Sequence, residues 1–342
     1  MLGRRVRSGL RAARLRAAAA AHRRRRRRVV TAGAAGNAAT PAAGRGLVPI
    51  LVDSLGRDGS TLTMRLLASS PQIATEPRHT HDLRSFELRY FAYMWEWARL
   101  LDADEWPRDR WGDRSVATLL ERPTGLVGPP LWMPRGLFEP GADGTPISRR
   151  AFELVWGELS ARAALQVEIE RGTPASQVRY YAEKHRNSWR LDLSTLPELH
   201  LVVLLRDPRD VLASMEGFNR MRGDSGFGRQ RGLSDEQYVD LLISRHRERL
   251  RWVAEVLRDD RWPVLRFDEL VGDLPGVAGR LERRLGIELD PDAVLADRSM
   301  RSAHVSAASP QAAVGRWRQD LAPEVAERIA AGLAPELRDV GL

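Results

Sequence analysis

Cysteine is absent from the 342-residue sequence, which excludes disulfide bridges and thiolate metal sites. Long apolar runs are absent as well, since residues 47–55 and 199–205 fall far short of the roughly 20 residues that a membrane-spanning helix needs. The composition, with 43% hydrophobic residues, is that of a globular protein with a large core. We therefore expect a cytoplasmic protein without a transmembrane anchor.

Lysine is almost absent too. Of the 54 basic residues, Lys184 is the only lysine and all the others are arginine. An ammonium group is a compact point donor, which a planar guanidinium does not reproduce. A single lysine among so many arginines indicates a position where lysine itself is required. The alternative is that this lysine has been retained by chance.

Acidic residues are missing from residues 1–46, which carry thirteen arginines. Subtracting these from the net charge of +9 leaves −4 for the rest of the chain, so the basic character is confined to this segment. A like-charged segment of this kind repels itself and cannot bury apolar surface. We expect residues 1–46 to be a disordered extension, either without function or in contact with anionic lipid or nucleic acid, followed by one domain over residues 47–342.

A strand, a glycine-containing loop and a helix are predicted over residues 48–67. Gly56 and Gly59 flank Arg57, and a periodic apolar pattern begins at Ser60. Glycine lets main-chain N–H groups turn inward, and the start of a helix adds unpaired donors and the positive end of its dipole. This loop therefore suits phosphate or a similar anion.

The loop departs from the ATP-binding pattern G-x-x-x-x-G-K-[ST]. If Gly59 is aligned with the second glycine, Ser54 stands at the first glycine and Ser60 at the lysine. An ATP-type loop needs that lysine at the β- and γ-phosphates, so its absence argues against nucleoside triphosphate chemistry. A kinase or ATPase with a degenerate P-loop is the main alternative, and it would need Mg²⁺ and another cation in place of the lysine.

A second apolar strand is predicted at residues 199–205, with Arg206 directly after it. Asp207 is a candidate N-cap for the following helix, Asp210 adds a negative charge to its first turn, and Ser214 lies two turns in. Open α/β sheets bind ligands at the carboxyl ends of their strands. The pattern predicts a three-layer, P-loop-like α/β fold, with a central parallel β-sheet flanked by helices and a binding site at this edge.

Together the two motifs resemble those of sulfotransferases that depend on 3′-phosphoadenosine 5′-phosphosulfate (PAPS), in particular bacterial and tyrosylprotein-type members. Residues 57–62 resemble the 5′-phosphosulfate loop of that family, and residues 206–214, with the strand before them, closely resemble its 3′-phosphate motif. Asp58 replaces the serine that is usual in the family. Its carboxylate repels an anion unless Arg57 or Arg65 pairs with it.

The resemblance implies a PAPS site that requires no metal ion, because cations neutralise the charge of the donor. Arg57 and Lys184 would act in catalysis, with Lys184 near the transferred sulfuryl group, while Arg206 and Ser214 would bind the 3′-phosphate. Arg316, in a Gly-Arg-Trp segment, would contact phosphate or adenosine. The donor-binding residues that the resemblance implies are Arg57, Asp58, Gly59, Ser60, Thr61, Leu62, Arg206, Ser214 and Arg316.

Glu76, in a short segment behind the phosphate loop, is the catalytic base that the resemblance implies. Glu183 and His185, which flank the lysine, are the alternatives. The expected acceptor is a hydroxyl or amine of a small molecule, a carbohydrate or a peptide. The helical and irregular stretch at about 80–178, which resembles no part of the family, would select it.

Two further function classes stay open. A non-catalytic nucleotide-binding protein would keep the fold without turnover, and the carboxylate of Asp58 beside the sulfate favours this reading. A metal hydrolase built on Glu76, His79 and His81 is the other class.

Periodicity and capping patterns predict the remaining elements. Ser234 and Gln237 form a capping box at the start of a long helix. Helices are expected at residues 61–69, 82–101, 148–171 and 234–258 and after residue 321, and strands at residues 177–182 and 264–267.

Overall fold

The computed structural model describes residues 46–75, 90–99, 147–185, 198–223, 232–297, 309 and 311–342. The chain divides into two compact units, a larger one of residues 50–75 and 184–342 and a smaller one of residues 1–49 and 76–183. Residues 1–45 of the expected extension, Glu76 and much of the expected acceptor segment lie outside the described residues. The predicted domain layout therefore stays a prediction.

A five-stranded sheet has the strand order β2-β3-β1-β4-β5. Strand β1 pairs in parallel with β4, with Val52 opposite Val202, and β4 pairs in parallel with β5, with Leu204 opposite Leu265. The strands of the two motifs are thus neighbours, and their carboxyl ends meet at one edge. The strands are β1 (Val48–Asp53), β2 (Ile73–Thr75), β3 (Tyr180–His185), β4 (His200–Leu205) and β5 (Val264–Arg266).

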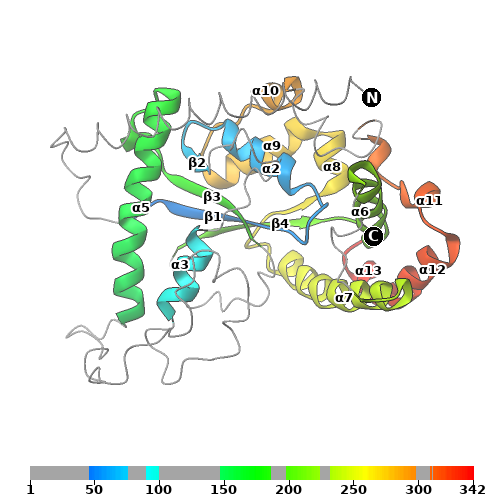
Figure 1. The fold of residues 1–342 in the computed structure, drawn as a ribbon. Coiled ribbons are helices and arrows are strands. Elements are labelled where there is room, and N and C mark those ends of the chain that lie inside the picture. The colour runs from blue at the N-terminus through cyan, green and yellow to red at the C-terminus, as the bar shows by residue number, and fades with distance from the viewer. Residues whose placement is uncertain are drawn as a thin grey trace, which may run out of the picture. The chain divides into compact units, whose positions relative to one another are not determined.

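Helices of the larger unit lie on both faces of its part of the sheet, with α2 and α9 on one side of β4 and α7 on the other (Figure 1). This arrangement confirms the predicted three-layer α/β fold. Among the described helices, none is both long enough and apolar enough to cross a membrane. The helices of this unit are α2 (Ser60–Ser69), α6 (Pro208–Arg222), α7 (Asp235–Asp259), α8 (Phe267–Gly272), α9 (Leu274–Leu285), α10 (Pro291–Ala296), the 3₁₀ turn η7 (Gln311–Ala313), α11 (Trp317–Asp320), α12 (Pro323–Gly332) and α13 (Ala334–Asp339).

The smaller unit contains helices α3 (Tyr90–Arg99) and α5 (Ile147–Arg171) and the 3₁₀ turn η4 (Ala175–Gln177). Aromatic rings hold it together, mostly in edge-to-face pairs whose centroids lie 5.1 to 5.3 Å apart. Edge-to-face geometry suits the ring quadrupoles and adds to the gain from burial. The rings are those of Phe91, Trp95, Phe152, Trp156 and Tyr181.

Strand β3 begins later than the sequence predicts. Residues 175–177 form the turn η4 after Pro174, so the strand starts at Tyr180 and runs on to His185. Glu183 and Lys184 are therefore strand residues, and successive strand side chains point to opposite faces of a sheet. The lysine and the glutamate beside it consequently serve different neighbours.

Two helix starts agree with the capping patterns. The side chain of Asp207 accepts a hydrogen bond from the N–H of Arg209, with Pro208 at the first position of α6. Both bonds of the Ser234–Gln237 capping box are present at the start of α7. These local predictions are confirmed because a cap uses only residues within one turn of the chain.

A buried histidine in α7 makes stability depend on pH. Nδ1 of His246 donates to the carbonyl oxygen of Leu242 at 3.0 Å, and burial lowers the pKa of His246 to about 4. Between its ordinary value of 6.5 and this lowered value, the unfolded chain binds a proton that the folded chain does not. The free energy of unfolding must therefore fall as the pH falls through this window.

We expect the step from pH 7 to pH 4.5 to remove about 2 to 3 kcal/mol of stability through this residue. His246→Gln should remove that part of the loss, because glutamine does not titrate. Urea unfolding of both proteins at the two pH values measures the difference. An equal loss in the two proteins would show that His246 does not titrate in this way.

Candidate functional site

The loop between β1 and α2 has an unusual backbone. Gly56, Arg57 and Gly59 all have positive φ, at 97°, 64° and 101°. The positive φ of Gly59 favours glycine, and a Cβ atom there would lie 3.0 Å from Cδ1 of Leu270, which would have to shift by a few tenths of an ångström. Gly59 is the N-cap of α2 and provides no side-chain cap. The first N–H groups of α2, which include that of Ser60, therefore have no capping side chain from that position.

The side chain of Asp58 is hydrogen-bonded to other residues of this loop. Its carboxylate accepts hydrogen bonds from the hydroxyl of Ser54 at 2.6 Å and from the N–H of Leu55 at 2.9 Å, and the Ser54 hydroxyl accepts one from the N–H of Gly56 at 3.0 Å. These contacts are all to neutral donors of the loop itself. Asp58 therefore helps to set the shape of the loop.

Lys184 reaches the first turn of α2. Its Nζ donates to Oγ1 of Thr61 at 3.0 Å, and the residue is only 8% exposed. The single lysine of the chain thus lies beside the helix start that the sequence predicted as an anion site.

Arg57 joins the two sequence motifs. Its Nε donates to Oγ of Ser214 in α6 at 3.0 Å, and its guanidinium lies 4.6 Å from the ring centroid of Phe218. The loop after β1 and the helix after β4 are therefore linked through the side chains that the sequence assigned to opposite ends of one ligand.

Arg206 is buried between two main-chain segments. Its Nη1 donates to the carbonyl oxygen of Arg57 at 2.5 Å and its Nη2 to that of Ala313 at 2.6 Å, while its guanidinium lies 3.7 Å from the ring centroid of Phe267. Within the described residues, its buried Nε has no hydrogen-bond partner. A phosphate bound by Arg206 would have to accept from guanidinium N–H groups that do not donate to these two carbonyl oxygens.

Burial lowers the pKa of Arg206 to about 10. The negative charges of Asp210 and Asp58 act in the opposite direction, and the positive charges of Arg57 and Arg316 add to the lowering. Arg206 stays cationic at neutral pH, in a neighbourhood that contains two other arginines.

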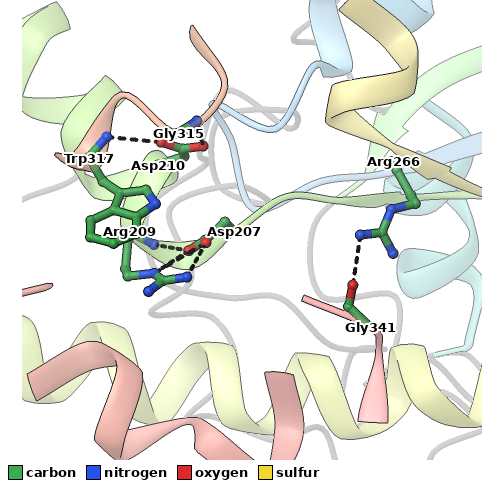
Figure 2. A network of polar contacts seen from close by, with 7 residues as sticks. All are labelled: Asp207, Arg209, Asp210, Arg266, Gly315, Trp317 and Gly341. Atoms are coloured by element: carbon green, nitrogen blue, oxygen red, sulfur yellow. Dashed lines mark hydrogen bonds and ion pairs between the residues drawn. The ribbon is translucent and has the colours of Figure 1, made fainter. Parts of the chain in front are cut away.

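Asp210 binds the main chain of a distant segment. Its carboxylate accepts hydrogen bonds from the N–H of Gly315 at 2.7 Å and from that of Trp317 at 3.1 Å (Figure 2). Burial raises the pKa of Asp210, while these two hydrogen bonds and the charge of Arg206 act the other way. The sequence placed Asp210 only as a charge in the first turn of a helix, because its partners lie 105 and 107 residues further along.

The side chain of Glu183 is hydrogen-bonded to the start of helix α3 in the smaller unit. Its two carboxylate oxygens accept hydrogen bonds from the N–H groups of Phe91 and Ala92, each at 3.0 Å, at the start of α3. A carboxylate that serves two main-chain donors is poorly suited to take a proton from an acceptor. Glu76 lies outside the described residues, and of its two alternatives, Glu183 and His185, these contacts argue against Glu183.

The larger unit thus brings together nearly all of the residues that the sequence predicted at the donor. They come from the loop before α2, the first turn of α2, the last residues of β3, the start of α6 and the segment before α11. Arg316 lies in that last segment and forms an ion pair with Asp320. Within the described parts of the chain, no group of three or more metal-ligating side chains is found, and His79 and His81 lie outside them.

No protein family model and no curated protein sequence matches the chain. Three solved structures similar to it are the sulfotransferase domain of the curacin biosynthetic pathway, retinol dehydratase in complex with androsterone and the inactive cofactor PAP, and the sulfotransferase STF9 from Mycobacterium avium. Identities are 16%, 15% and 18%, with TM-scores of 0.44, 0.40 and 0.40. The matches cover 85%, 86% and 86% of this chain and 99%, 82% and 77% of the others.

Proposed function

We propose that this protein is a sulfotransferase that moves a sulfuryl group from PAPS to a hydroxyl or amine acceptor. The observation that carries the proposal is the hydrogen bond from Nε of Arg57 to Oγ of Ser214, which joins two motifs that lie 157 residues apart. PAPS has a phosphosulfate at one end of its adenosine and a 3′-phosphate on the ribose. A site for it needs two anion-binding motifs side by side.

The 5′-phosphosulfate is proposed to bind at the start of α2. The N–H groups of residues 59–62, the hydroxyls of Ser60 and Thr61 and the positive end of the helix dipole all favour an anion there. Arg57 adds a positive charge from the loop. The contact of Lys184 with Thr61 supports a place for its ammonium at the oxygen that bridges phosphorus and sulfur.

The 3′-phosphate is proposed to bind near the start of α6. Ser214 offers a hydroxyl, while Arg206 and Arg316 offer positive charge, and hydrogen bonds from charged donors to phosphate are the stronger kind. Ordinary adenine nucleotides lack a 3′-phosphate, so these residues would select the donor.

The proposed reaction is an in-line displacement at sulfur. A bond forms between the acceptor oxygen or nitrogen and sulfur while the bond from sulfur to the bridging oxygen breaks, and 3′-phosphoadenosine 5′-phosphate (PAP) leaves. Lys184 and Arg57 neutralise the charge that grows on the leaving oxygen. Glu76 takes the proton of the acceptor, a step worth about 10² to 10⁴ in rate. Residues at about 80–178 would choose among small-molecule, carbohydrate and peptide acceptors.

Calorimetric titration tests the donor site through Ser214→Ala. The wild type should bind PAP more tightly than adenosine 5′-phosphate, and the variant should lose about tenfold or more of that preference, because one hydrogen bond to a charged phosphate is worth about 1.5 to 3 kcal/mol. Binding of adenosine 5′-phosphate, which has no group for Ser214, serves as the internal control.

Transfer of labelled sulfate from PAPS to a panel of hydroxyl and amine acceptors, in the presence of EDTA, tests the reaction itself. Tight binding of ATP with Mg²⁺ but not of PAP would contradict the proposal and favour a degenerate P-loop kinase. Binding of PAP without transfer to any acceptor would favour a non-catalytic nucleotide-binding protein.

A further inference from the structure

A negative charge lies inside the proposed anion site and calls for an explanation. Asp210 is only 4% exposed, and its charge acts on Arg206, which is proposed to bind phosphate. A carboxylate so placed weakens the attraction of the site for a phosphate. Nothing in the proposed chemistry uses it as an acid, a base or a nucleophile.

Among the described residues, the hydrogen bonds of the Asp210 side chain go to one stretch of main chain, residues 313–317. Its two oxygens accept from the N–H groups of Gly315 and Trp317 (Figure 2), the residues before and after Arg316 in the sequence. From the same motif, Nη2 of Arg206 donates to the carbonyl oxygen of Ala313 at 2.6 Å. The carboxylate of Asp210 accepts from N–H groups of the 313–317 segment and the guanidinium of Arg206 donates to its carbonyl oxygen, so the pair holds both kinds of main-chain group.

A second contact fastens the same segment. The guanidinium of Arg209 lies 4.1 Å from the ring centroid of Trp317, and Asp207 holds that guanidinium with an Nη2 to Oδ2 distance of 2.6 Å. A guanidinium over an indole ring is a favourable cation–π arrangement. The Arg-Asp-Pro-Arg-Asp motif after β4 is therefore largely engaged with the 313–317 segment.

We propose that Asp210 is a positioning residue, which holds the 313–317 segment and so sets the place of Arg316 at the donor site. The inference rests on the proposed function, since it supposes that the site binds a nucleotide. Gly315 makes the turn with φ +68°, and the anchored N–H groups before and after Arg316 fix where its side chain leaves the main chain. The affinity gained by holding the 313–317 segment, and with it Arg316, in place offsets the repulsion that the carboxylate exerts on a phosphate.

The proposal and simple electrostatics predict opposite results for Asp210→Asn. Removing a negative charge from an anion site should tighten the binding of PAP if charge alone matters. If Asp210 positions the 313–317 segment, the variant should bind PAP about tenfold more weakly, because an amide side chain offers one acceptor and a donor where the segment supplies two N–H groups.

Asp240→Asn is the control. It makes the same exchange of carboxylate for amide at an exposed residue of α7, whose ion pair is with Arg328 of α12 rather than with the 313–317 segment. The control should bind PAP as tightly as the wild type or more tightly. With saturating acceptor, Asp210→Asn should raise KM for PAPS while kcat changes little, and a general loss of structure would not produce that split. Asp210→Glu, which keeps the charge on a longer arm, should recover part of the affinity.

Hydrogen exchange of the Gly315 and Trp317 amides gives a readout that needs no nucleotide. Asp210→Asn should speed exchange at these amides in the free protein, and Asp240→Asn should not. If Asp210→Asn binds PAP as tightly as Asp240→Asn, or leaves the exchange unchanged, the inference is wrong. If the wild type binds no PAP, the proposed function fails instead, and the exchange result still decides whether Asp210 holds the segment. Should Asp210→Asn not fold, Asp210→Glu takes its place in both measurements.

Discussion

Lys184→Ala is expected to lower kcat for sulfuryl transfer by about 10²- to 10³-fold, the usual loss when one donor to a developing negative charge is removed. The affinity for PAP should change much less, because the ammonium acts most strongly on charge that appears only as the bond to sulfur breaks. Lys184→Arg should recover only a small part of the rate, since a planar guanidinium does not fit the position of a compact ammonium.

The place of Lys184 explains why the loss should be large. Its Nζ is held by Oγ1 of Thr61 at 3.0 Å and the residue is 8% exposed, so water is a poor substitute for it. Single-turnover rates with labelled PAPS, beside calorimetric binding of PAP, separate the two effects. A kcat within a few-fold of the wild type would remove Lys184 from the proposed mechanism.

The parts of the fold that the sequence predicts well are those with local signals. The ends of β1 and the start of α2 follow from an apolar run and a glycine at the turn, and the start of α6 follows from the cap Asp207 with Pro208 behind it. The start of β3 was predicted three residues too early, at Gln177. Residues 175–177 form a 3₁₀ turn there, and nothing in their side chains opposes a strand.

In the candidate site, too, the sequence predicts some features and not others. Arg57, Lys184 and Ser214 belong to recognisable segments, and the structure brings these segments together. The contacts of Asp210 and Glu183 could not be predicted, because both carboxylates bind N–H groups of the main chain, which every residue except proline offers. When the partner is a distant main-chain group, its residue type carries no signal that a sequence pattern could reveal.

The loop that carries Arg57 also depends on a buried ion pair beneath it. Asp53, the last residue of β1, is 0% exposed, and Arg249 of α7 is 4% exposed. Nη2 of Arg249 lies 2.8 Å from Oδ2 of Asp53 and donates to the carbonyl oxygen of Leu204 at 2.5 Å. One guanidinium thus holds the ends of β1 and β4, the two strands that lead into the proposed phosphate motifs.

Asp53→Asn is expected to lower the free energy of unfolding by about 3 to 5 kcal/mol, because it leaves the buried guanidinium of Arg249 without its counter-charge. Desolvation of an unpaired charge is the source of this loss, so the change should exceed that of an ordinary surface substitution several-fold. Urea unfolding followed by circular dichroism measures it, provided that the slope of the transition matches that of the wild type.

The double variant Asp53→Val with Arg249→Met tests the physical reason. It removes both charges and leaves apolar side chains, so it should be far more stable than Asp53→Asn alone, even though it changes more of the protein. If the double variant is as unstable as the single one, loss of packing rather than an uncompensated charge explains the effect. If Asp53→Asn lies within about 1 kcal/mol of the wild type, the ion pair does not hold the two strand ends as inferred.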